Sequence, residues 1–107
     1  MNLAAFKRSL DSEDPPTGIS TAILGLWWDA KGHWDQAHDA AQKGEDSPGR
    51  WVHAYLHRKE GDLGNAAYWY RRAGRAMPDI PLGKEWEQIA LALLEEIAAK
   101  KTPRGLP

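Results

Sequence analysis

Two glycines, Gly32 and Gly61, stand 29 residues apart, and each separates two segments whose apolar residues recur at helical spacing. Glycine readily adopts the positive φ that ends a helix, so each of these glycines predicts the turn of a helical hairpin. Aligning the two glycines also places Trp34 on Leu63. A single hairpin cannot bury its own apolar face, so two consecutive hairpins are expected to stack. The sequence therefore predicts an all-α protein.

The segments around these turns outline one all-α domain that covers residues 1–107 and contains about five helices, because no stretch alternates as a half-buried strand would. Its parts are an N-terminal segment (1–16), a first hairpin (18–44), a second hairpin (48–76) and a C-terminal helix (83–101). Ser47 followed by Pro48 predicts a helix start with the serine as cap. We expect the C-terminal helix to cap the stack or to form a dimer contact, and the residues after it to form a tail.

The overall composition excludes several kinds of site and partner. The chain has 107 residues, a formal net charge of −1 and no cysteine. The absence of cysteine excludes disulfides, thiolate metal sites and cysteine nucleophiles. No apolar run approaches the roughly 20 residues of a membrane span, and the near-neutral charge gives no reason to expect an anionic membrane as partner. We expect a cytoplasmic protein.

One short stretch interleaves aromatic and basic side chains, namely Tyr68, Trp69, Arg71, Arg72 and Arg75. Proteins that bind single-stranded nucleic acid use such a composition. Helical rotation, however, places Trp69 toward a different edge from Tyr68, Arg72 and Arg75. Together with the net charge of −1, this separation disfavours nucleic acid as the partner.

Both hairpins place small, aromatic and proline residues at positions typical of a known helical repeat. These residues are Leu24, Gly25, Trp28, Gly32 and Ala37 in the first hairpin, and Gly61, Asp62, Leu63, Ala66, Tyr70, Ala73 and Pro78 in the second. Residues 18–78 therefore resemble the tetratricopeptide repeat family, and the fragment NAAYWYRRAG also resembles the related Sel1-type repeats. The first unit is about five residues shorter than the family's period, and His53, Ala54 and His57 stand where the family has Leu-Gly and an aromatic residue. The stretch HRKEGDLGNAAYWYRRAG further resembles a family of small uncharacterised microbial proteins, which implies no function.

The tetratricopeptide resemblance implies a binding surface, because in that family the first helix of each unit lines a concave face. The corresponding residues here are Leu26, Asp29, Trp51, Tyr55, Arg58 and Lys59. Aromatic walls with two cations suit an acidic or aromatic peptide, or a small anionic ligand. The alternative is that Arg58 and Lys59 face solvent and that Trp51 packs against the C-terminal helix. The favoured function is a non-catalytic module that binds a protein or peptide partner, or a second copy of the chain in a homodimer.

A second hypothesis begins from His53 and His57, which lie one helical turn apart and so share one helix face. This spacing can hold a divalent metal ion if a third ligand comes from His38, Glu60 or Asp62. The motif HAYLH lacks the glutamate that HExxH peptidases use as a base, and no serine triad or phosphate loop is present, so we assign no catalytic residue. The alternative is that both histidines are buried and hydrogen-bonded to tyrosine or tryptophan. The metal interpretation predicts a small metal-dependent or acid–base enzyme.

Overall fold

The computed structural model describes residues 1–44 and 46–101, and these residues form helices and no strand. The helices are α1 (Leu3–Ser9), α2 (Thr21–Ala30), α3 (Trp34–Lys43), α4 (Ser47–Glu60), α5 (Leu63–Arg72) and α6 (Leu82–Lys101). The all-α prediction is confirmed, with six helices where about five were expected. The additional helix is α1, which the Asn2 side chain caps by accepting a hydrogen bond from the Ala5 N–H at 2.8 Å. The tail expected at residues 102–107 lies outside the described residues.

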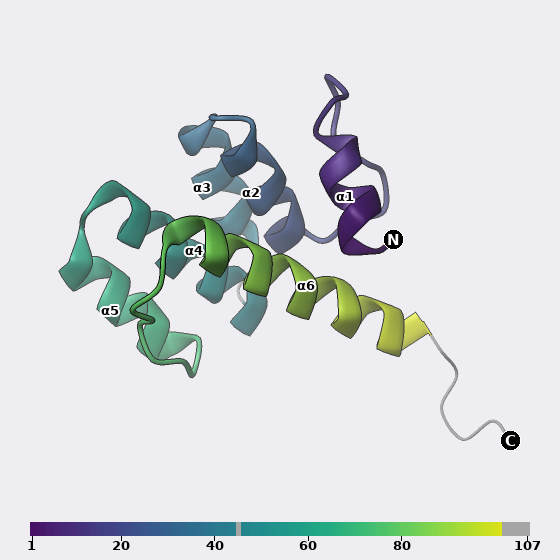
Figure 1. Ribbon diagram of the computed structural model, residues 1–107. Helices are drawn as coiled ribbons and strands as arrows, with labels where there is room; N and C mark the ends of the chain where they lie inside the picture. Colours follow the sequence, from purple (N-terminus) through teal and green to yellow (C-terminus); the bar gives the residue numbers. More distant parts are fainter. Residues whose placement is uncertain (45, 102–107) are drawn as a thin grey trace, which may run out of the picture.

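The helices α2 and α3 form one hairpin, α4 and α5 form the second, and α3 packs against α4 (Figure 1). Gly61 ends α4 with a φ of 88°, a left-handed conformation that glycine adopts without steric cost. The carboxylate of Asp62 then caps α5 by accepting a hydrogen bond from the Asn65 N–H at 3.3 Å. The Gly-Asp turn of the sequence is therefore a helix end followed at once by a helix start.

The start of α4 differs from the prediction. Asp46, rather than Ser47, is the cap, and its carboxylate accepts a hydrogen bond from the Gly49 N–H at 3.0 Å. The Ser47 hydroxyl instead donates to the Ala73 carbonyl at 2.8 Å. The serine therefore joins the beginning of the second hairpin to its end, which is a long-range contact that a local capping rule does not include.

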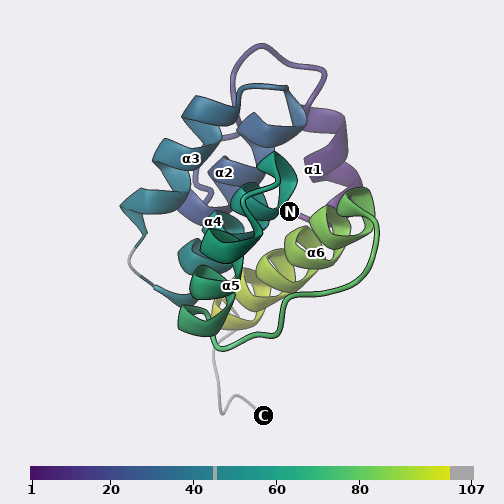
Figure 2. The same cartoon turned by 90° about the vertical axis from the view of Figure 1, so that its left-hand side faces the viewer.

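The long helix α6 runs across α4 and also packs against α1 and α2, whereas α3 lies on the opposite side of α4 (Figure 2). The Trp86 indole N–H donates to the Leu26 carbonyl at 3.0 Å, and its ring stacks on Phe6 with the ring centres 5.7 Å apart. Both rings are buried in the core. Within residues 1–44 and 46–101, no helix has the length and apolar character needed to cross a bilayer.

A buried carboxylate fixes the beginning of α6 against the second hairpin. Glu85 is 1 % exposed, and it accepts hydrogen bonds from the Tyr70 hydroxyl at 2.6 Å and from the Arg58 guanidinium at 2.8 Å. Arg58 also donates to the Ile80 carbonyl. Burial, followed by the bond to Glu85, raises the pKa of Tyr70, so the hydroxyl stays protonated and acts as a donor. Each polar group of this buried network thus has a partner, as burial requires.

Candidate metal centre

Three imidazoles converge where α3 meets α4. His38 comes from α3, and His53 and His57 come from successive turns of α4. The ring centres are 4.6 Å apart for His38 and His53, 5.2 Å for His38 and His57, and 4.7 Å for His53 and His57. One ring nitrogen from each residue lies within 4.8 Å of those of the other two. This histidine trio (His38, His53 and His57) has the spacing of ligands that could share one metal ion.

Two tryptophans enclose the histidine trio. Trp34 stacks on His38 with the ring centres 4.8 Å apart, and Trp69 stacks on His53 at 4.1 Å. His53 and His57 are buried, and His38 is half-buried. The trio is therefore shielded on two sides by apolar surface, while its α3 member keeps some access to solvent.

Only one member of the trio makes side-chain hydrogen bonds within the part of the chain that the structure describes. His57 Nδ1 lies 2.5 Å from a Glu60 carboxylate oxygen, and His57 Nε2 lies 3.3 Å from the Asn65 amide nitrogen. The side chains of His38 and His53 have no hydrogen-bond partner there. The alternative interpretation, in which His53 and His57 are both held by tyrosine or tryptophan donors, does not describe this arrangement.

The environment of His38 and His53 favours their neutral form. Burial, and then the nearby His38 and His57, lowers the pKa of His53 to about 4 from the ordinary 6.5. Burial and the neighbouring His57 also lower the pKa of His38. Neutral imidazole is the form that binds a metal, so at pH 7 His53 is ready to coordinate without first losing a proton.

Among the three candidate third ligands, the described residues place only His38 close to both His53 and His57. His38 completes the trio, whereas Glu60 contacts the Nδ1 atom of His57. Asp62 is exposed and caps α5, although it also lies close enough to His57 and Glu60 for these three residues to form a second candidate set of metal ligands. A carboxylate on the distal nitrogen of a ligating histidine fixes the ring's tautomer and orientation. Glu60 is therefore placed to orient His57 rather than to replace His38.

The residues expected to line an open concave groove are largely covered by α6. Leu26, Asp29, Trp51 and Tyr55 are buried, and Arg58 is bonded to Glu85. The expectation of an open groove lined by these side chains is therefore wrong, because the protein's own C-terminal helix occupies that face.

Part of the expected ligand-binding set does reach a pocket. Lys59 donates to the Asp29 carboxylate at 2.8 Å, and the Tyr55 hydroxyl donates to the same carboxylate, also at 2.8 Å. These three side chains line a pocket of about 410 Å³, to which Leu82 and Trp86 contribute apolar surface. The pocket lies between the beginning of α6 and the helices α1, α2 and α4, on a different face from the histidine trio.

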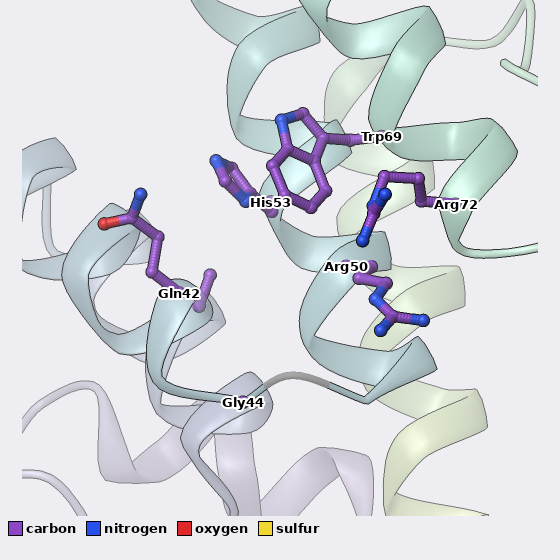
Figure 3. Close-up of a pocket in the computed structure, with 7 residues that line it drawn as sticks. Gln42, Gly44, Arg50, His53, Trp69 and Arg72 are labelled. Atoms are coloured by element: carbon purple, nitrogen blue, oxygen red, sulfur yellow. The ribbon is translucent and has the colours of Figure 1, made fainter.

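A second pocket, of about 320 Å³, adjoins the histidine trio through His53 (Figure 3). Its walls are formed by Ala41, Gln42, Gly44, Arg50, His53, Trp69 and Arg72, and we call it the arginine pocket. Sequence reasoning did not identify Arg50 as a site residue, although it lies three and seven residues before the two histidines of α4. This spacing places Arg50 on their helix face, and it is the signal that could have indicated it.

Comparison with known proteins leaves the family open: no family model, no curated protein and no solved structure matches this chain. The tetratricopeptide resemblance stays a prediction, and we infer function from the residues of the site itself.

Proposed function

We propose that the protein binds one divalent transition-metal ion through His38, His53 and His57. The observation that supports this function best is the convergence of three ring nitrogens within 4.8 Å when two of the three rings have no hydrogen-bond partner among the described residues. No buried side-chain nitrogen of the described residues lacks a partner, so the ring nitrogens of His38 and His53 that make no hydrogen bond are accessible to solvent and to a metal ion. Because Glu60 contacts His57 Nδ1, an ion would bind His57 through Nε2 and replace its contact with Asn65. A set of three imidazoles suits zinc, and also copper, nickel or cobalt.

Three protein ligands leave a coordination position open on a tetrahedral zinc ion. This is the arrangement of catalytic zinc sites, whereas structural sites use four protein ligands. Zinc bound in this way lowers the pKa of a water molecule and polarises carbonyl or phosphoryl oxygens. The chain's own contribution would be to fix His57 through Glu60 and to limit water through Trp34 and Trp69. This arrangement supports a small metal-dependent enzyme over a purely structural metal site.

The proposal can be tested by titrating metal-free protein with Zn²⁺ in a calorimeter and with Co²⁺ in an absorbance spectrometer. We expect one ion per chain and the d–d absorbance of tetrahedral cobalt. His38→Gln and His53→Gln should each weaken binding by about 100-fold, because each removes a direct ligand. His33→Gln is the matched control, since His33 is exposed and lies outside the trio. Wild-type protein that binds neither ion, or variants that all behave like the control while retaining native circular dichroism, would refute the site.

A second candidate function, binding of a protein or peptide partner, is supported by the 410 Å³ pocket at Asp29, Tyr55 and Lys59. Its apolar lining and its two lysines, Lys7 and Lys59, suit a peptide that carries one aromatic and one acidic side chain. We expect such peptides to shift the backbone amide resonances around Lys59 and Leu82 in NMR spectra. A panel of acidic aromatic peptides that leaves these resonances unmoved at millimolar concentration would reject this function.

A further inference from the structure

The arginine pocket adjoins the proposed metal site and differs from it in charge. Its inner wall is formed by the stacked rings of His53 and Trp69, and Gln42 of α3 lies across the pocket from them (Figure 3). Arg50 of α4 and Arg72 of α5 extend side by side toward the pocket from the remaining side (Figure 3). His53 therefore belongs both to the histidine trio and to the pocket wall.

The two guanidinium groups carry charge that the described residues do not neutralise. Arg50 is half-buried, and its side chain has no hydrogen bond or ion pair in residues 1–44 and 46–101. Arg72 donates to the Tyr68 hydroxyl at 3.2 Å and stacks on the Trp69 ring, with 5.4 Å between its central carbon and the ring centre. Of the described residues that line the pocket, none is acidic. Arg75, which follows α5, lies outside this pocket, with 3.3 Å between its central carbon and the centre of the Trp51 ring.

Two arginines that line one pocket, with no carboxylate among its described lining residues, present the donors that recognise oxyanions. The guanidinium fork matches the oxygen spacing of phosphate and carboxylate groups and can bind them in a bidentate manner. Stacking on Trp69 holds Arg72 in place before any ligand arrives, which lowers the entropic cost of binding. The pocket volume of about 320 Å³ is near the lower limit for small-molecule sites, so a large nucleotide is disfavoured.

We infer that the arginine pocket binds the phosphate group of a small phosphorylated molecule, held by Arg50 and Arg72 beside the metal ion. This inference rests on the proposed metal function, and it names the substrate class of the same site. A metal on His53 adds positive charge at the pocket wall, which attracts the anion further. A metal ion and arginines together around a phosphoryl group are a recurring arrangement for stabilising its charge.

The test uses inorganic phosphate as the probe, with full-length protein in its metal-free and zinc-loaded forms. Binding is followed by amide chemical shifts in NMR spectra at constant ionic strength, after free zinc has been removed. We expect saturable binding near Arg50 and Arg72 that zinc loading tightens by about tenfold, because the metal charge lies next to the anion. Arg50→Gln and Arg72→Gln should each weaken phosphate binding by about tenfold while zinc affinity stays unchanged. Acetate at the same concentration should bind more weakly, since it carries less charge.

The matched control is Arg71→Gln, because Arg71 is exposed on the same helix but does not line the pocket. If Arg50→Gln and Arg71→Gln weaken phosphate binding equally, the signal reflects general charge and the inference is refuted. Zinc-loaded protein that binds no phosphate also refutes it, and the metal site then stands alone. Phosphate that binds through Arg50 and Arg72 while zinc does not bind at all refutes the proposed metal function instead. Equal phosphate affinity with and without bound zinc refutes the link between the two sites.

Discussion

Glu85 is the residue whose removal should most disturb the packing of α6. We consider the substitution Glu85→Ala, which deletes a carboxylate that is 1 % exposed and accepts hydrogen bonds from Tyr70 and Arg58. Alanine is an excellent helix former, so the substitution does not weaken α6 through helix propensity. Any loss of stability therefore measures the buried network.

The expected loss follows from the groups that the substitution leaves without a partner. The Arg58 side chain is 14 % exposed, and it would keep only its bond to the Ile80 carbonyl. Breaking a buried ion pair by removing one partner costs about 3 to 5 kcal/mol. The Tyr70 hydroxyl would also lose its acceptor, which costs about 1 to 3 kcal/mol when the group stays buried. Because these two penalties overlap and Arg58 keeps one bond, we expect a total of about 4 kcal/mol.

Urea denaturation followed by circular dichroism would measure this loss. Glu87→Ala is the control on the same helix, since Glu87 pairs with Lys7 at the surface and its removal should leave the transition midpoint nearly unchanged. In the double variant Glu85→Ala/Tyr70→Phe the losses should be less than additive, because phenylalanine leaves no hydroxyl to satisfy. A loss below about 1 kcal/mol for Glu85→Ala, or one equal to that of the control, would contradict the reasoning.

Three further predictions concern stability and packing. In metal-free protein, the contribution of His53 to the free energy of unfolding should fall by about 3 kcal/mol between pH 6.5 and pH 4, because His53 takes up a proton in the unfolded chain over this range and stays neutral in the folded chain. Urea titrations of wild type and His53→Gln at both pH values would measure this loss. Parallel pH profiles of the two proteins would disprove it. Gly49→Ala should destabilise the fold strongly, because a Cβ there would lie 2.3 Å from the Gly44 carbonyl oxygen. At Gly64 a Cβ would meet no atom within 4 Å, so Gly64→Ala should stabilise α5 by up to about 1 kcal/mol. Melting temperatures that shift in the same direction for both variants would contradict this. Trp86→Phe should lower the free energy of unfolding by about 0.5 to 1.5 kcal/mol, because it removes the hydrogen bond from the indole to the Leu26 carbonyl, and an unchanged urea midpoint would count against that bond.

The sequence was sufficient to predict the helical hairpins because their signals are local. The turn at Gly61 and the cap at Asp62 depend on a few neighbouring residues, and the structure places both as expected. The alignment of Trp34 with Leu63 was less informative, since Trp34 is half-buried whereas Leu63 is 55 % exposed. The burial of each side chain depends on which helix packs beside it, and a repeat pattern does not contain that information.

The site could be predicted only in part, for the same reason. The spacing of His53 and His57 on one helix indicated two ligands, but it could not choose among His38, Glu60 and Asp62. That choice depends on how α3 packs against α4 in three dimensions. The open groove was predicted wrongly because its cover depends on Glu85, which lies 27 residues from Arg58 and 15 from Tyr70 in the sequence.

The histidine trio is divided between the two hairpins, since His38 belongs to the first and His53 and His57 belong to the second. An ion held by all three would therefore act as a cross-link at the junction between the hairpins, closing a loop of the chain from α3 to α4. The affinity of the protein for this ion would depend on the stability of the contact between the hairpins, because separation of the hairpins moves His38 away from His53 and His57. The coupling is reciprocal: the free energy by which docking of the hairpins improves metal binding equals the free energy by which the bound ion stabilises the docked hairpins. A substitution that weakens the packing between the hairpins would then lower the measured metal affinity, even where the substituted residue lies far from the three ligands.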